Sequence, residues 1–320
     1  MPDSIKSVDE FLCYIRDNIF HKFGNFSALE QYPFYQIFYR GQVRVGEPEW
    51  SILPSVFRSG RKAIENKIYT TVLTECPQDF IDCKSHCEIL SKMQHYGVPT
   101  RLVDITSNAL VSLYFSVVDD KGDVVDSEDG VVFVIGAPDG HVKEFDSDTL
   151  SILSSLPRLR ADEQEVIWKS AMKLMYDDET TKIRKFNMGT VAIQRLLHEI
   201  KKEKPQFEPI INPNDVLYDF IFTPQKTNPR IIRQHGAFII FGLGHDGHML
   251  DESLPEFDNY RNYSESFIKK NPIVLRKIRV EKTRKETILR ELKRCGISHT
   301  SLFPELYKMG EYISIHNSIP

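Results

Sequence analysis

The sequence lacks any apolar run near the roughly 18 residues that a membrane-spanning helix needs. Its N-terminus has no basic segment followed by an apolar one, so no secretory leader is expected. Positive charge is not in excess, because the formal net charge is -4 at pH 7. Such a chain has no overall field that attracts nucleic acid or an anionic membrane. We therefore expect a cytoplasmic protein without membrane contact, for which nucleic acid is not the expected partner.

Cysteine is scarce, and the usual catalytic and metal-binding motifs are missing. The five cysteines are odd in number and show no paired metal-type spacing, which is typical of a reduced intracellular chain. There is no Gly-x-Ser-x-Gly elbow, and His198-Glu199 cannot begin a zinc-protease motif because position 202 is lysine. The acidic loop at 119–130 lacks the ligand order of a calcium-binding loop, so it is expected to be a solvated hairpin tip. No metal site is predicted, and covalent hydrolytic catalysis is not supported.

What the sequence does contain is enough apolar material for a real core, 41% of 320 residues. Helical and strand patterns are interspersed without strict alternation, which predicts the α+β class with a mixed or antiparallel central sheet flanked by helices. A capping box at 7–10 begins an amphipathic helix to about His21. Strands are expected at 35–42, 131–135, 220–223, 237–241 and 273–280, and helices at 62–75, from about Asp79 into the segment that begins at Glu88, at 162–175, 191–204 and 282–294, and once more in the tail.

The stretch at 88–117 reads most like a site. A helix is predicted to end at Gly97, with Pro99 preventing its resumption, and a second helix begins at a Ser107 or Asn108 cap. A polar elbow is therefore expected between two apolar helices, and it holds Thr100, Arg101, Asp104, Thr106, Ser107 and Asn108.

Two more polar clusters lie at the edges of predicted strands. Arg40-Gly41-Gln42 ends the first strand, and Arg230, Arg233 and Gln234 come just before a later one. The glycine leaves room for a ligand or another backbone, whereas Arg40 could also simply pair with a carboxylate at the strand end. If the three clusters converge, their guanidinium and amide groups suit a phosphate-bearing ligand such as a nucleotide.

The turn at Gly242-Leu243-Gly244-His245-Asp246-Gly247 has the spacing of a dinucleotide-binding fingerprint. Proline follows soon after it, with no convincing crossover helix, so we interpret it as a turn.

Several long segments of the sequence resemble a known protein family. The segments FYRGQ at 38–42, tryptophan and SILPSVFR at 50–58, and MQHYGVPTRLVDITSNALVSLYFS at 93–116 resemble the FRG domain, as do FTPQKTNPRIIRQHGAFIIFG at 222–242 and ELKRCGISHTSLFPELYKMGEYI at 291–313. Tyr39 stands where the family name implies phenylalanine, and Ile105 where an aromatic residue is expected. The resemblance implies one FRG-type domain over 1–320, with an N-terminal helix in 1–30, core motifs in 31–136, a mostly helical insert in 137–210, and late strands and C-terminal helices in 211–320.

A more distant resemblance is to arginine-type ADP-ribosyltransferases, whose order of a strand with Tyr-Arg-Gly, a polar segment opening a helix, and a late strand is similar. It implies NAD as a substrate rather than a bound cofactor, a nucleotide ligand and a protein acceptor. Carried over by position, Arg40 clamps phosphates, Asp104 and Thr106 form the middle element, and Gln234 stands where those enzymes have a glutamate. An amide cannot stabilise a cationic transition state as a carboxylate does, so Glu88 is considered as a substitute.

These arguments give a predicted site. The candidate catalytic residues are Gln234, Asp104 and Glu88, and the candidate ligand-binding residues are Arg40, Gly41, Gln42, Gln94, His95, Thr100, Arg101, Thr106, Asn108, Arg230 and Arg233. Two alternatives stay open. One is a non-catalytic module that recognises a phosphorylated or acidic partner, and the other is an internal scaffold whose arginines are buried in ion pairs.

Overall fold

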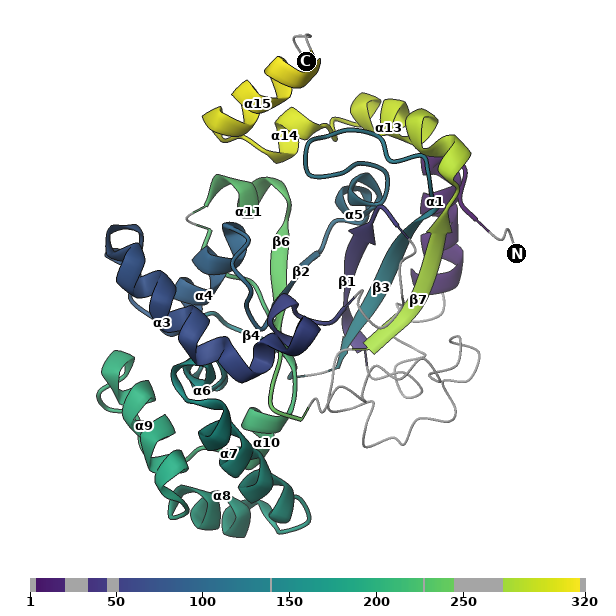
Figure 1. The fold of residues 1–320 in the computed structure, drawn as a ribbon. Coiled ribbons are helices and arrows are strands. Elements are labelled where there is room, and N and C mark those ends of the chain that lie inside the picture. Colours follow the sequence, from purple (N-terminus) through teal and green to yellow (C-terminus); the bar gives the residue numbers. More distant parts are fainter. Residues whose placement is uncertain are drawn as a thin grey trace.

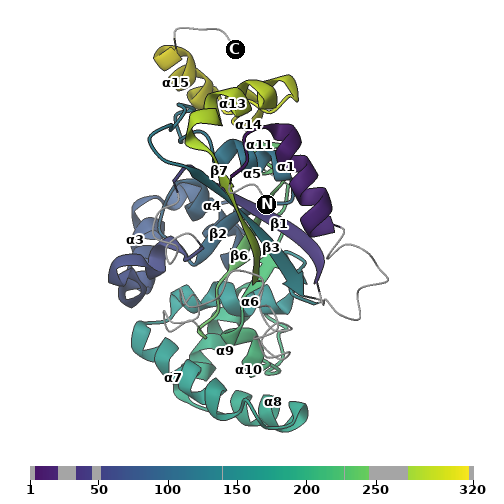
Figure 2. The same ribbon diagram turned by 90° about the vertical axis from the view of Figure 1, so that its right-hand side faces the viewer.

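The computed structural model describes residues 4–20, 34–44, 52–138, 140–226, 228–244 and 273–316. Its framework is a seven-stranded sheet in the order β4-β5-β6-β2-β1-β3-β7 (Figure 1). Neighbouring strands are antiparallel, except that β4 and β5 are parallel. Helices flank the sheet (Figures 1 and 2). The predicted α+β class with a mixed sheet is therefore confirmed.

Five of the described strands lie close to their predicted positions, whereas β2 and β4 were not among the predicted strands. Their apolar runs are buried on both faces of the sheet, as in β3, where each residue from Val131 to Ala137 is buried. The strands are β1 Phe34–Gln42, β2 Leu102–Thr106, β3 Gly130–Pro138, β4 Val142–Lys143, β5 Phe220–Phe222, β6 Gly236–Ile240 and β7 Ile273–Val280.

The helices occupy both ends of the molecule. They are α1 Val8–Ile15, α3 Glu65–Glu75, α4 His86–His95, α5 Ala109–Phe115, α6 Asp148–Ser155, α7 Ala161–Lys173, α8 Glu179–Asn187, α9 Val191–Glu203, α10 Pro213–Leu217, α11 Pro229–Arg233, α13 Lys285–Arg294, α14 His299–Leu302 and α15 Leu306–His316. Shorter 3₁₀ segments occur at Ser55–Ile64, Pro77–Phe80, Leu156–Arg158 and Lys282–Arg284, and a π turn at Arg16–Phe20. Both views place α13–α15 at one end and α6–α10 at the other (Figures 1 and 2).

Two helix predictions differ from the structure, and the predicted end of the first helix is not tested. The helix expected from about Asp79 begins at His86, because the Ser85 hydroxyl accepts a hydrogen bond from the Glu88 backbone N–H at 3.2 Å and caps it there. The single tail helix is two helices, α14 and α15. The first helix is α-helical to Ile15, and its predicted end at His21 lies outside the described residues, as do positions 245–247 of the glycine-containing turn.

The core has three parts. Helices α1, α5 and α13 pack on one face of β1, β3 and β7 through residues such as Tyr39 and Val134. Helices α3, α4 and α6–α10 pack on β5 and β6 through residues such as Phe222 and Phe238. A third cluster, which includes Phe38, fills the opposite face of the sheet. The helices that cover β1 and those that cover β6 therefore leave the middle of the sheet between them.

Strands β1 and β2 diverge at this middle position. Among the described residues they share one registered pair, Tyr39 with Thr106, whereas β1 pairs with β3 along its length. Beyond that pair, the Arg40 Nη1 donates to the Asp104 backbone carbonyl at 2.6 Å, so a side chain bridges the two strands there. Helix α5 lies directly over β1 at the next residue, Gly41. The split between the strands creates the space for a site.

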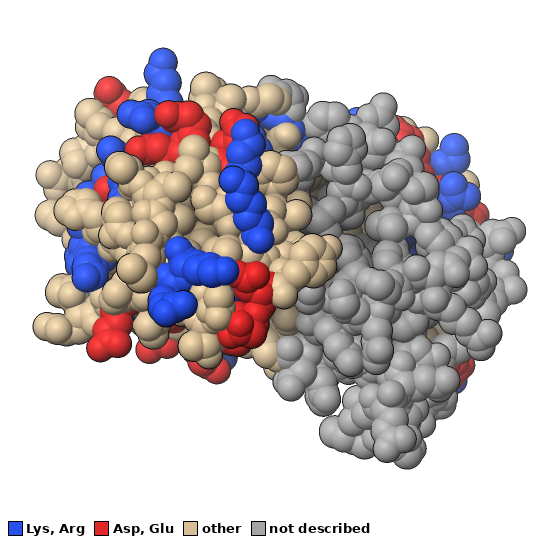
Figure 3. All heavy atoms as spheres, turned by 90° about the horizontal axis from the view of Figure 1, so that it is seen from below, with Lys and Arg blue, Asp and Glu red and all other residues tan. Residues whose placement is uncertain are grey.

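On the face seen from below in Figure 1, basic and acidic side chains of the described residues are mixed and form no continuous basic surface (Figure 3). Across the described segments, we find no helix with both the length and the apolar character needed to cross a bilayer.

Candidate functional site

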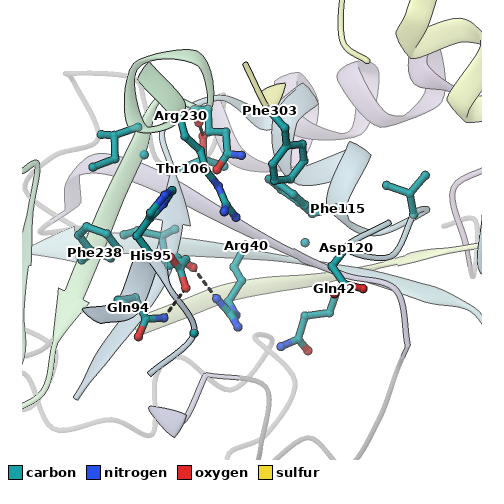
Figure 4. Close-up of a pocket in the computed structure, with 18 of the residues that line it drawn as sticks. Arg40, Gln42, Gln94, His95, Thr106, Phe115, Asp120, Arg230, Phe238 and Phe303 are labelled. Atoms are coloured by element: carbon teal, nitrogen blue, oxygen red, sulfur yellow. Dashed lines mark hydrogen bonds between the residues drawn. The ribbon is translucent and has the colours of Figure 1, made fainter. Parts of the chain in front are cut away.

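A cavity of about 1120 Å³ opens where β1 and β2 separate (Figure 4). Its walls come from β1, the C-terminal end of α4, β2, the end of α5, α11, β6, Phe303 just after α14, and the start of α15. The three polar clusters of the sequence therefore meet at one place. Nine predicted site residues line the cavity, namely Arg40, Gly41, Gln42, Gln94, His95, Asp104, Thr106, Arg230 and Gln234.

Arg40 has both a structural and an electrostatic part in this cavity. Its hydrogen bond to Asp104 fixes the guanidinium between the strands. Burial lowers the pKa of Arg40, the Asp104 carboxylate opposes this, and the nearby Arg58 lowers it further. An arginine keeps its charge despite such a shift. Two cationic groups that repel each other at one wall favour an anionic ligand.

Asp104 is held by a relay of hydrogen bonds from α4. The Gln94 Nε2 donates to Asp104 Oδ2 at 2.6 Å (Figure 4). The Thr100 hydroxyl in turn donates to Gln94 Oε1 at 2.6 Å. Thr100 is buried behind the cavity wall, and its oxygen accepts from the Leu102 backbone N–H at 3.1 Å. Thr100 is thus a supporting residue, whereas Gln94 and Asp104 face the cavity.

His95 lies beside the relay at the last position of α4. Its Nε2 is 3.6 Å from Glu305 Oε1, and both Glu305 carboxylate oxygens are buried with no hydrogen-bond partner among the described residues. Burial lowers the pKa of His95, and the positive charge of Arg230 lowers it further. The carboxylates of Glu305 and Asp104 act in the opposite direction and raise it. Since the ordinary value is 6.5, His95 is mostly neutral at pH 7 and adds little charge to the cavity.

Arg230 enters the cavity from α11. Its guanidinium carbon lies 4.7 Å from the centre of the Phe303 ring, in a cation–π arrangement (Figure 4). Within the part of the chain that the structure describes, the guanidinium forms no ion pair and no hydrogen bond. Arg230 therefore keeps all of its donors for a ligand.

Gln234 lines the cavity, but it does not lie on a strand as the resemblance implies. It follows the last residue of α11, and β6 begins two residues later. Its Nε2 donates to the Leu302 backbone carbonyl at 3.1 Å, and its own backbone carbonyl accepts from the Thr106 hydroxyl at 2.7 Å. The side chain joins α11 to α14, so Gln234 holds the cavity wall.

The structure places Arg101 outside the cavity, in contrast to its predicted ligand-binding role. Its side chain is 0% exposed and donates from Nε to Glu65 Oε1 at 2.9 Å. It also donates to the Phe241 backbone carbonyl at 3.1 Å and to Gln164 at 3.3 Å. Arg101 thus ties β2 to α3, α7 and the end of β6. For this residue, the scaffold alternative describes its position.

Three other predicted residues also lie away from the cavity. Glu88 is in the first turn of α4 and accepts from the Lys84 backbone N–H at 2.8 Å, as part of the helix cap. Asn108 caps α5 by accepting from the Leu110 backbone N–H at 2.9 Å. Arg233 is exposed on α11 and does not line the cavity. The position of each of these three residues away from the cavity is set by its place on its own helix.

Sequence reasoning missed several lining residues. Arg58, Arg44 and Lys308 add cationic groups, while Phe115 and Phe303 add an aromatic wall. These two rings are 6.1 Å apart and nearly perpendicular. The sequence did contain a signal for Arg58 and Phe303, since both residues belong to segments that resemble the family. No group of three or more His, Cys, Asp or Glu side chains in the described ranges is placed to hold a metal ion.

The class of protein is now defined: an α+β domain on a mostly antiparallel sheet, with an arginine-rich and aromatic cavity at a split between two strands. Residues 35–123 match the family model of the FRG domain, so the chain is an FRG-domain-containing protein. A search of the curated proteins finds no match, and a search of the solved structures finds none either.

Proposed function

We propose that this FRG-domain protein binds a nucleotide, NAD or a related phosphate-bearing ligand, in the cavity between β1 and β2. The observation that supports this is the convergence of Arg40, Arg58 and Arg230, from three separate segments, on one space. Guanidinium groups suit phosphate oxygens in charge and geometry. Phe115 and Phe303 provide flat apolar surface for a base. The volume of about 1120 Å³ slightly exceeds the usual upper size of small-molecule sites, about 1,000 Å³, which leaves room for a dinucleotide.

Arg230→Ala is the sharpest test of phosphate binding. The variant is expected to fold normally, because the guanidinium only packs on Phe303 within the described structure. Loss of a charge-assisted hydrogen bond should weaken the binding of ADP, ADP-ribose or NAD by about 1.5 to 3 kcal/mol, which is roughly 10- to 100-fold in affinity. Calorimetric titration measures this directly, and thermal unfolding with and without ligand checks it.

The matched control is Arg233→Ala, which removes the same charge from the same short helix without touching the cavity. It should bind all three nucleotides as the wild type does. If no nucleotide stabilises the wild type, or if both variants weaken binding equally, the proposal fails. Binding of a phosphoserine peptide in that case would favour the module that recognises a phosphorylated partner.

The proposal extends to ADP-ribosyltransferase-like chemistry on NAD because of Asp104. Of the three candidate catalytic residues, Gln234 has no carboxylate and Glu88 lies in a helix cap, so Asp104 is the one of the three that brings a carboxylate to the cavity, which Asp119 and Asp120 also line. In such a reaction the C1′–N bond to nicotinamide breaks and its electron pair leaves with the neutral nicotinamide. The acceptor oxygen or water bonds to C1′ and gives its proton to the carboxylate. A carboxylate also stabilises the cationic transition state.

Nicotinamide release from NAD tests this extension. We expect the wild type to release it and Asp104→Asn to lower the rate by at least about 100-fold while NAD still binds. Chromatography of the products gives the rate, and titration gives the affinity. Binding of NAD by the wild type without any nicotinamide release would contradict the catalytic extension and leave the binding proposal intact.

A further inference from the structure

The orientation of the Gln94 amide is fixed by its two neighbours. The Asp104 carboxylate only accepts hydrogen bonds, so it takes an N–H of the amide, and Gln94 Oε1 accepts the proton of the Thr100 hydroxyl, whose oxygen also accepts from the Leu102 backbone N–H. The amide oxygen therefore faces Thr100 and the amide N–H₂ faces Asp104, to which it donates at 2.6 Å. The Asp104 carboxylate is held in one position by a buried hydroxyl two residues before β2.

The second oxygen of that carboxylate faces the cavity. Gln94 donates to Oδ2, and no described side chain or backbone group donates to Oδ1. Asp104 is exposed to the cavity space, whereas Thr100 is only 1% exposed. Asp104 Oδ1 is therefore a hydrogen-bond acceptor that faces the cavity and that no donor in the described structure uses.

The charges around Asp104 restrict what can fill this position. A phosphate is drawn to Arg230, Arg58 and Arg40, but the Asp104 carboxylate repels it by like charge. The group that meets Oδ1 has to be a hydrogen-bond donor next to the phosphate. Sugar hydroxyls have this chemistry, and they lie close to the phosphate in a ribose phosphate. A deoxyribose lacks one of these donors.

We propose that Asp104, positioned by the Thr100–Gln94 relay, accepts a hydrogen bond from a ribose hydroxyl, so that the cavity selects ribonucleotides over deoxyribonucleotides. This inference rests on the proposed binding of a nucleotide and deepens it. Arg230 supplies affinity for the phosphate, and Asp104 supplies selectivity for the sugar. Thr100 and Gln94 are positioning residues.

The test is calorimetric titration of the full chain with ADP, 2′-deoxy-ADP and 3′-deoxy-ADP. The wild type should bind ADP at least about tenfold more tightly than one of the two deoxy analogues, because a polar group left without its partner disfavours the analogue. Asp104→Ala should bind ADP and that analogue with nearly equal affinity. Arg230→Ala should lower the affinity for ADP and for that analogue by the same factor, so that the ratio of the two affinities stays unchanged.

The relay has its own pair of variants. Thr100→Val removes the hydroxyl that orients Gln94 and should reduce the selectivity to about threefold or less, whereas Thr100→Ser keeps the hydroxyl and should retain it. If ADP binds the wild type but both deoxy analogues bind within about twofold of it, the ribose inference is overturned and nucleotide binding stands. If none of the three binds, the proposed function itself fails. If Thr100→Val does not fold, the wild type and Asp104→Ala still decide the matter.

Discussion

Replacing Arg101 by alanine is expected to lower the free energy of unfolding by about 3 to 5 kcal/mol. The reason is its complete burial together with Glu65, which is 3% exposed, in a network that also includes Gln164. Without the guanidinium, the Glu65 carboxylate is left buried without a charge partner, and the Phe241 carbonyl loses a donor. Urea unfolding followed by circular dichroism measures the loss. Glu65→Ala should cost a similar amount.

The double variant Arg101→Met with Glu65→Leu separates charge from packing. It removes both buried charges at once, so it should be more stable than either single alanine variant. A loss below about 1 kcal/mol for Arg101→Ala would show that the pair is solvated in solution, contrary to its position here. Because Arg101 does not line the cavity, any folded Arg101 variant should bind nucleotide as the wild type does.

Gly41→Ala is the second change with a large expected effect. A Cβ at this position would lie 1.8 Å from the Ser112 carbonyl oxygen and 2.9 Å from the Ser116 nitrogen. Both atoms belong to the backbone of α5 and its C-cap, so no side-chain rotation relieves the clash. We expect a loss of about 3 kcal/mol or more in the free energy of unfolding, because α5 has to move away from β1.

Gly310→Ala is the matched control for Gly41→Ala, because it makes the same chemical change in an open place. No heavy atom lies within 4 Å of a Cβ added at Gly310, which is inside α15. Alanine favours a helix over glycine, so stability should stay unchanged or rise by up to about 1 kcal/mol. Equal stability of the two variants in thermal and urea unfolding would contradict the close approach of α5 and β1.

The fold could be predicted in good part because its signals are local. The apolar run of β3, the alternation in β1 and the Asn108 cap of α5 each depend on neighbouring residues. The start of α4 was misplaced because two local signals compete, a proline at position 77 and a serine cap at position 85. The order of strands in the sheet could not be derived, since it depends on contacts between distant segments.

The site could be predicted only as a set of candidates. Arg101 and Asp104 belong to the same polar elbow, yet Arg101 is buried with Glu65 while Asp104 faces the cavity. Nothing near Arg101 in the sequence indicates Glu65 as its partner. Gln234 was correctly placed just before a strand, but helix α11 ahead of it was not predicted, because this short helix has no apolar periodicity and none of its residues is buried.

The FRG match at 35–123 covers nearly all of β1 together with α4, β2 and α5, but not the parts of the cavity wall that come from later segments. Arg230 and Phe238 come from α11 and β6, and Phe303 and Lys308 come from the C-terminal segment. The matched segment is therefore not a portable module. Taken alone, it would expose the edges of β1 and β2 that β3 and β6 cover in this chain, and exposed edges invite aggregation. Proteins that share only this segment share one part of the cavity wall. Their ligand preference can differ through the residues that the later segments contribute to the rest of the wall.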